Sequence, residues 1–101
     1  MAIAINRNQL EADGNGYLFH GKDHGNTNVS FIYVDMHPGE GVRLHRHGYD
    51  EVFVILEGNV RFTVGGDVVN ASAGDVVVGP ASVPHAFVSV GPGVLRQMVT
   101  K

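Results

Sequence analysis

Short apolar segments separated by turn residues run along the whole chain. The longer segments, rich in β-branched and aromatic residues, lie at 29–36, 52–56, 60–64 and 85–90. Shorter ones lie at 17–19, 67–72, 76–78 and 94–100. The polar stretch at 6–16 has room for one helical turn, and no segment has the apolar stripe of a long helix. Roughly nine or ten short strands predict an all-β sandwich or barrel.

Pairs of turn-forming residues divide the segments. Gly58-Asn59 and Gly65-Gly66 are two-residue hairpin signals, so we expect a hairpin at each. Pro38 follows the segment at 29–36 and ends it, because proline cannot donate to a strand ladder.

A group of metal-ligand side chains lies between Gly39 and Gly58, in the sequence GEGVRLHRHGYDEVFVILEG. Because residues i and i+2 of a strand share a face, His45 and His47 would project side by side. Glu51 opens the next apolar segment, and the short connection at 48–50 would bring it back to the two imidazoles. Two imidazoles and a carboxylate at one point indicate a metal site.

Length and charge narrow the classes of function. The chain has 101 residues, a formal net charge of -3 and no cysteine. The length predicts a single domain over 1–101. Without a basic run we expect neither nucleic acid nor a membrane as partner. Without a signal sequence or an apolar run of about 20 residues we expect a cytoplasmic protein. Without thiolates, nitrogen and oxygen must hold any metal, which disfavours structural tetrahedral zinc.

The spacing of the ligand residues resembles that of a known family. From Gly39 to Gly58 it is G-x5-H-x-H-x3-E-x6-G, which resembles the first motif of the cupin family position for position. The stretch from Gly74 to His85 resembles the second motif, G-x5-P-x-G-x2-H-x3-N, with Pro80 in place.

Two positions of the second motif depart from the family pattern. Ser82 stands where the family has glycine, which bears on the turn before His85. Ser89 stands where the family has asparagine, which bears on a supporting hydrogen bond. All four ligand positions are filled.

The resemblance implies a double-stranded β-helix, or jelly roll, often paired as a homodimer. It implies one divalent metal ion inside an open end of the barrel, held by His45, His47, Glu51 and His85. The ion would be iron, manganese, nickel, cobalt, copper or zinc. The residues themselves indicate the first three ligands, whereas only the motif places His85 with them.

Strand alternation suggests walls for the pocket. Arg43 shares a face with His45, so it would meet an anionic group of a substrate, or lie on the surface near the barrel mouth. Phe53 shares a face with Glu51, and Phe87 shares a face with His85. Both would form an aromatic wall or pack in the core.

Three hypotheses for function remain open. The leading one is a metal-dependent enzyme acting on a small oxygenated organic molecule, with dioxygenase chemistry favoured. The second is a lyase or isomerase that uses Lewis-acid chelation, for which Tyr49 is a candidate base. The third is a module that binds a small ligand without turnover.

Overall fold

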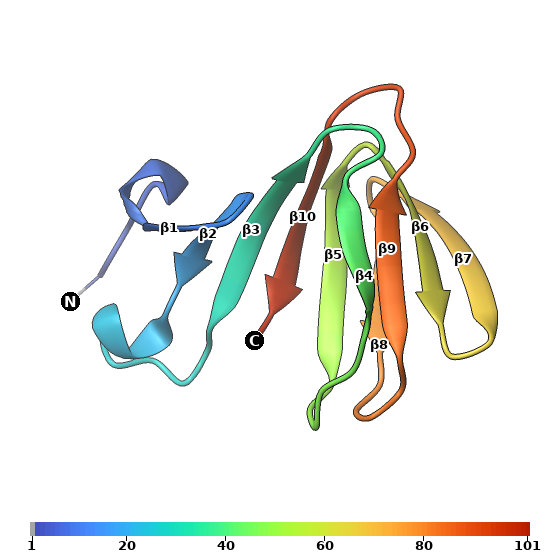
Figure 1. Ribbon diagram of the computed structural model, residues 1–101. Helices are drawn as coiled ribbons and strands as arrows, with labels where there is room; N and C mark the ends of the chain where they lie inside the picture. The colour runs from blue at the N-terminus through green and yellow to red at the C-terminus, as the bar shows by residue number, and fades with distance from the viewer. Residues whose placement is uncertain (1) are drawn as a thin grey trace.

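The computed structural model describes residues 2–101, which form two packed antiparallel β-sheets (Figure 1). The larger sheet contains, in spatial order, β1 (Glu11–Asp13), β2 (Gly16–Phe19), β3 (Phe31–Met36), β10 (Leu95–Thr100), β5 (Glu51–Glu57) and β8 (Val76–Gly79). The smaller contains β4 (Gly41–His45), β9 (His85–Ser89), β6 (Asn59–Val64) and β7 (Asp67–Ser72). The predicted all-β, jelly-roll fold is confirmed.

The core lies between the sheets and follows the two-residue period of the strands. Its buried residues are Ile32, Val34, Met36, Phe53, Ile55, Val60, Phe62, Ala71, Val77, Phe87, Leu95 and Val99. On β10 the inward face carries Gln97 as well as Leu95 and Val99, while Arg96 is exposed. The sequence left the direction of this strand open, because Gln97 is a polar residue at a core position. Its buried amide has no hydrogen-bond partner within residues 2–101.

The chain changes sheets at Gly58, where the sequence predicted a hairpin. β5 lies in the larger sheet and β6 in the smaller, so the two strands are not paired. Gly58 has a φ of +88°, and a Cβ there would collide with the carbonyl oxygen of Val94. Glycine therefore permits a sharp corner here. The other signal does form a hairpin, with Val64 paired to Asp67 across Gly65-Gly66.

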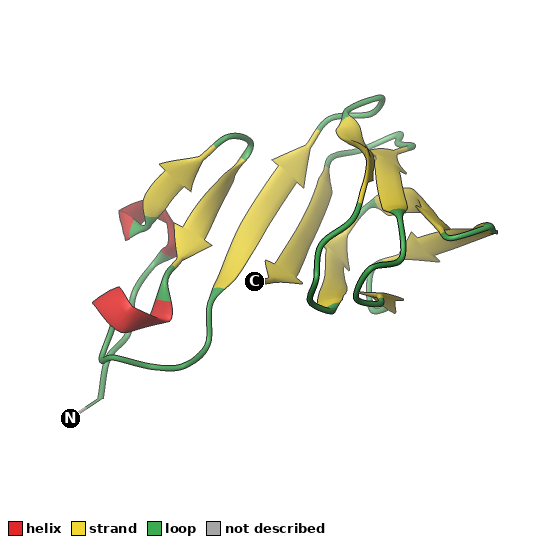
Figure 2. Ribbon diagram, turned by 60° about the horizontal axis from the view of Figure 1, so that its bottom comes forward, coloured by secondary structure: helices red, strands yellow, loops and turns green. Residues whose placement is uncertain are grey.

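The hairpin of β1 and β2 extends the larger sheet past the edge of the smaller one (Figures 1 and 2). A single 3-10 turn, η1 (Arg7–Gln9), precedes it and fits the helical turn expected in the stretch at 6–16. Arg7 donates to both carboxylate oxygens of Asp35 and lies over the rings of Tyr17 and Tyr33. The hydrogen bond to Asp35 raises the pKa of Arg7, so this contact stays ionised.

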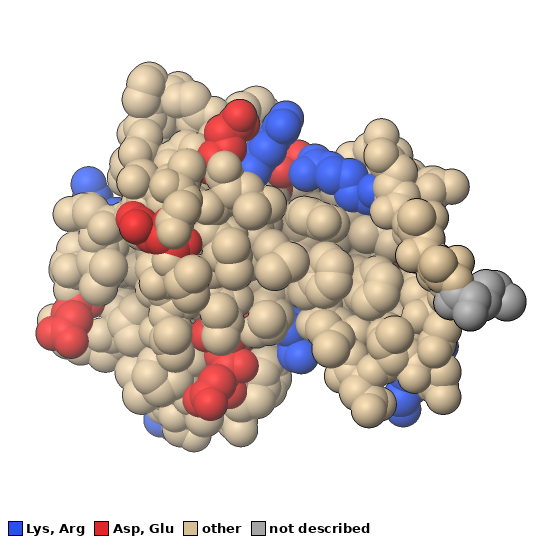
Figure 3. All heavy atoms as spheres, turned by 180° about the vertical axis from the view of Figure 1, so that it is seen from behind, with Lys and Arg blue, Asp and Glu red and all other residues tan. Residues whose placement is uncertain are grey.

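Charged side chains are dispersed over the face of the molecule drawn in Figure 3. Figure 3 shows acidic and basic groups singly or mixed on one face, most of which carries neither kind. Within residues 2–101, no helix has the length and apolar character that crossing a bilayer requires.

Candidate metal centre

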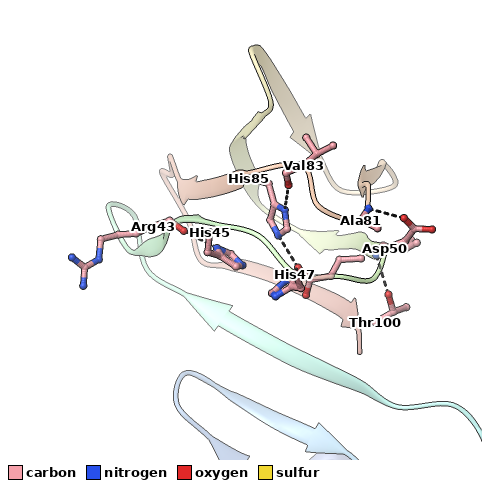
Figure 4. Close-up of polar contacts among 10 residues, drawn as sticks. Arg43, His45, His47, Asp50, Ala81, Val83, His85 and Thr100 are labelled. Atoms are coloured by element: carbon pink, nitrogen blue, oxygen red, sulfur yellow. Dashed lines mark hydrogen bonds and ion pairs between the residues drawn. The ribbon is translucent and has the colours of Figure 1, made fainter.

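The four side chains predicted as ligands converge between the two sheets (Figure 4). Their candidate ligand atoms all lie within 4.8 Å of one another. Glu51 begins β5 of the larger sheet, and His85 begins β9 of the smaller sheet. Both are buried, with exposed fractions of 5% and 1%, whereas His45 and His47 are partly exposed. The cluster is therefore open to solvent from the side of the two spaced histidines.

Strand pairing accounts for His45 and His85. The two residues are direct partners across β4 and β9, and their ring centroids lie 4.4 Å apart. His47 lies beyond the end of β4, so strand alternation does not explain its position. Its ring stacks on Tyr49 at a centroid separation of 4.7 Å. The connecting loop, rather than the strand, holds the second histidine.

Two hydrogen bonds tie together the loops that carry the two motifs. The amide of Ser82 donates to the carbonyl oxygen of His47 at 2.7 Å. The amide of Ala81 donates to Oδ1 of Asp50, also at 2.7 Å (Figure 4). Ser82 has a φ of +66°, so the turn keeps the left-handed conformation for which the family uses glycine. The departure at Ser82 leaves this turn intact, and Ser89 has a buried hydroxyl with no partner among the described residues.

Replacing Ser82 by glycine should stabilise the protein. A non-glycine residue in the left-handed region carries a strain of about 1–2 kcal/mol. The greater flexibility of unfolded glycine offsets about 0.4–1 kcal/mol of it. We expect a net gain of about 0.5–1 kcal/mol and a rise of a few degrees in Tm, measured by thermal unfolding. A lower Tm would contradict the strained turn.

The hydrogen bonds around the cluster fit a bound metal ion. Nδ1 of His85 donates to the carbonyl oxygen of Val83 at 3.1 Å, and Nε2 lies 2.8 Å from Oε1 of Glu51. A neutral imidazole has one N–H and cannot donate to both oxygens. A cation between Nε2 and the carboxylate removes this conflict, since adjacent ligands at about 2.1 Å from an ion are about 3 Å apart.

The remaining two imidazoles agree with this assignment. Nδ1 of His45 donates to the carbonyl oxygen of Arg43 at 2.7 Å, which leaves Nε2 with a free lone pair. Nε2 of His47 lies 2.7 Å from Oε1 of Glu51, the same oxygen that His85 approaches. Three ring nitrogens and one carboxylate oxygen make a donor set suited to a divalent transition metal.

Three members of the cluster, His45, His47 and Glu51, line a cavity of about 320 Å³. Phe53 and Phe87, the predicted aromatic wall, line this cavity and also belong to the core. Arg43 does not line it: its side chain is exposed and extends away from the imidazoles (Figure 4). The β4–β9 pairing shifts register between Val42 and His45, so Val42 faces the cavity instead. Of the two positions that the sequence left open for Arg43, the structure gives the one on the surface.

The sequence did not indicate the other residues that line the cavity. They are Asp13, Asn15, Gly16, Ile32, Val34, Met36, Gly41, Val42, Val99 and Lys101. Alternation along β3 shows that Ile32, Val34 and Met36 point inward. It does not show that they face a cavity rather than solid core, because that depends on which strand lies opposite.

Comparison with known proteins places the chain in a family. Residues 32–100 match the family model described as a cupin domain, which is more than half of the chain. The chain belongs to the cupin family. No curated protein matches this cupin significantly.

Solved structures share its fold. A cupin 2 conserved barrel domain protein from Salinispora arenicola has a TM-score of 0.75 and 20% identity, over 99% of this cupin and 86% of that chain. A protein from Thermotoga maritima described as a "predicted oxalate decarboxylase" has a TM-score of 0.74 and 21% identity, over 97% and 96%. The Schizosaccharomyces pombe Cnp3 cupin domain has a TM-score of 0.68 and 19% identity, over 71% of this chain. This cupin spans 53% of the Cnp3 chain.

Proposed function

We propose that this cupin is a metal-dependent dioxygenase acting on a small oxygenated organic substrate. The observation that carries the proposal is that His45, His47 and Glu51 of the four-ligand cluster line a cavity whose other lining residues are mostly apolar. A six-coordinate ion held by these four residues would keep two positions for small molecules, which suits chemistry between a substrate and dioxygen. Both atoms of dioxygen would enter the product, so the reaction needs no external reductant.

Different residues of the chain would bind the metal ion, orient its imidazole ligands and exclude water from the substrate. His45, His47, Glu51 and His85 would hold the ion, which when bound supplies Lewis acidity and, for iron or copper, redox chemistry. The carbonyl oxygens of Arg43 and Val83 orient two of the imidazoles by accepting their Nδ1–H groups. Phe53 and Phe87 keep water from the inner side of the substrate.

A second candidate is a Lewis-acid-assisted lyase. Lys101 lines the cavity and offers a proton-transfer group, and the relative from Thermotoga maritima is described as a predicted oxalate decarboxylase. Tyr49, the base suggested by the sequence, is 43% exposed and does not line the cavity. Both candidates use the same ligand cluster and differ in their need for dioxygen, so turnover under argon would favour the lyase.

Oxygen uptake tests the proposal. Protein reconstituted anaerobically with Fe(II) should consume oxygen with a member of a panel of 2-oxo acids, diketones and catechols. His45→Ala should lower the rate at least about a hundredfold, because loss of a direct ligand exceeds the tenfold to hundredfold typical of supporting residues. Arg43→Ala, outside the cavity, should retain the rate.

Two outcomes would contradict the proposal. If neither protein turns over any compound while both bind the panel equally, this cupin is a binding module. If His45→Ala keeps the oxygen uptake of the unaltered protein, the cluster is not the site of reaction.

A further inference from the structure

The residues that line the cavity reach from the ligand cluster to the β1–β2 turn. His45 ends β4 beside the cluster, whereas Gly41 and Val42 lie near the start of that strand. On the opposite wall, inward residues along β3 line the cavity as far as Met36. Gly16, paired with Val34 in the sheet, brings the β1–β2 turn to the wall. The cavity thus runs from the ligand cluster along the facing strands β3 and β4.

The walls between the two ends are apolar. The apolar lining residues are Ile32, Val34, Met36, Val42, Phe53, Phe87 and Val99. When the apolar part of a ligand packs against these residues, the complex is stabilised by about 25 cal/mol for each Å² of apolar ligand surface removed from water. A charged group placed there would lose its hydration without a partner. This part of the cavity therefore favours the hydrocarbon part of a ligand over a charged group.

The charges near the cluster suit a ligand with a single negative charge. A divalent ion, the carboxylates of Glu51 and Asp13 and the ammonium of Lys101 together leave one net positive charge along the cavity, which a monoanionic head group neutralises. Among residues 2–101, no arginine lines the cavity, and Lys101 provides an ammonium group in the lining. Small dianions are usually recognised by bidentate guanidinium groups, and the described lining residues include none.

We infer that this cupin binds a monoanionic chelator with two adjacent oxygen donors and an apolar body, and that it discriminates against small dianions such as oxalate. The inference rests on the proposed metal site and names the substrate class for it. The head group would lie at the cluster, and the body would extend along β3 and β4 past Val34 and Val42. A cavity of about 320 Å³ is at the small end of those that enclose organic ligands.

A chain-length series of 2-oxo acids tests the inference by binding alone. Protein loaded with Co(II) is titrated anaerobically with pyruvate, 2-oxobutanoate, 2-oxopentanoate, 2-oxohexanoate and oxalate, followed by the cobalt absorption band and by calorimetry. Each added methylene should raise the affinity about fourfold, so 2-oxohexanoate should bind about 60-fold more tightly than pyruvate. Oxalate should bind more weakly than 2-oxohexanoate.

A matched pair of variants locates the apolar body. Val42→Asp places a charge in the wall at a partly exposed position and should abolish the gain per methylene, while pyruvate still binds. Val68→Asp makes the same change on β7, at a position that is 63% exposed and away from the cavity. It should leave the series unchanged.

The outcomes separate this inference from the proposed function. A flat series, or oxalate binding more tightly than 2-oxohexanoate, overturns the substrate class while the cobalt band shows that the metal site stands. An unchanged series in Val42→Asp also overturns it. Failure to take up cobalt overturns the metal site itself and, with it, the proposed function.

Discussion

Replacing His85 by alanine should abolish tight metal binding. The side chain is 1% exposed and lies against Glu51, so its loss removes one ligand and leaves the carboxylate with a single imidazole contact. We expect the affinity for Co(II) or Mn(II) to fall at least about a hundredfold, measured by calorimetric titration of metal-free protein. The cavity left in the core should also cost about 2–4 kcal/mol of stability.

Two variants make this result interpretable. His37→Ala removes an exposed histidine outside the cluster and should bind metal as the unaltered protein does. Glu51→Gln nearly keeps the volume of the buried Glu51 side chain, so we expect this variant to fold even if His85→Ala unfolds. Because it lacks the carboxylate, it should still lose metal affinity. Retained affinity in a folded His85→Ala protein would contradict the assignment of this ligand.

Replacing Gly58 by alanine should strongly destabilise the fold. A Cβ at this position would collide with the backbone of Val94, and the φ of +88° is unfavourable for any side chain. Because a backbone carbonyl cannot swing away like the end of a side chain, the corner between β5 and β6 must shift. We expect a loss of about 2–3 kcal/mol, which corresponds to a Tm lowered by roughly 10–20 °C in a domain of this size.

Gly66→Ala is the matched control. A Cβ at Gly66 has no heavy atom within 4 Å, so the substitution meets open space. Its Tm should remain within a few degrees of that of the unaltered protein, as for most surface substitutions. Equal losses in the two variants would show that the collision at Gly58 is relieved at little cost.

Much of the fold was predictable because its signals are local. The alternation in β5 and β9 fixes which residues point inward, and turn residues mark most strand ends. The corner at Gly58 was not predictable from the dipeptide alone. Glycine before asparagine suits a hairpin turn and a change of sheet equally, and the choice depends on Val94, which lies far along the chain.

The ligand set was more predictable than its surroundings. The motif spacing names His45, His47, Glu51 and His85, and the structure brings them together. The position of Arg43 could not be decided from the sequence, because one irregularity in the β4–β9 pairing exchanges the faces of neighbouring residues and places Arg43 on the surface. Such a shift arises from the partner strand and leaves no mark in the sequence of β4.

Anomalous diffraction from crystals of the Mn(II)- or Fe(II)-loaded protein tests the metal centre most directly. One peak per chain should appear at bonding distance from Nε2 of the three histidines and a carboxylate oxygen of Glu51, the donors that the structure brings together. A peak elsewhere, or none at the cluster in crystals of folded protein at saturating metal, would contradict the metal site and leave a ligand-binding barrel.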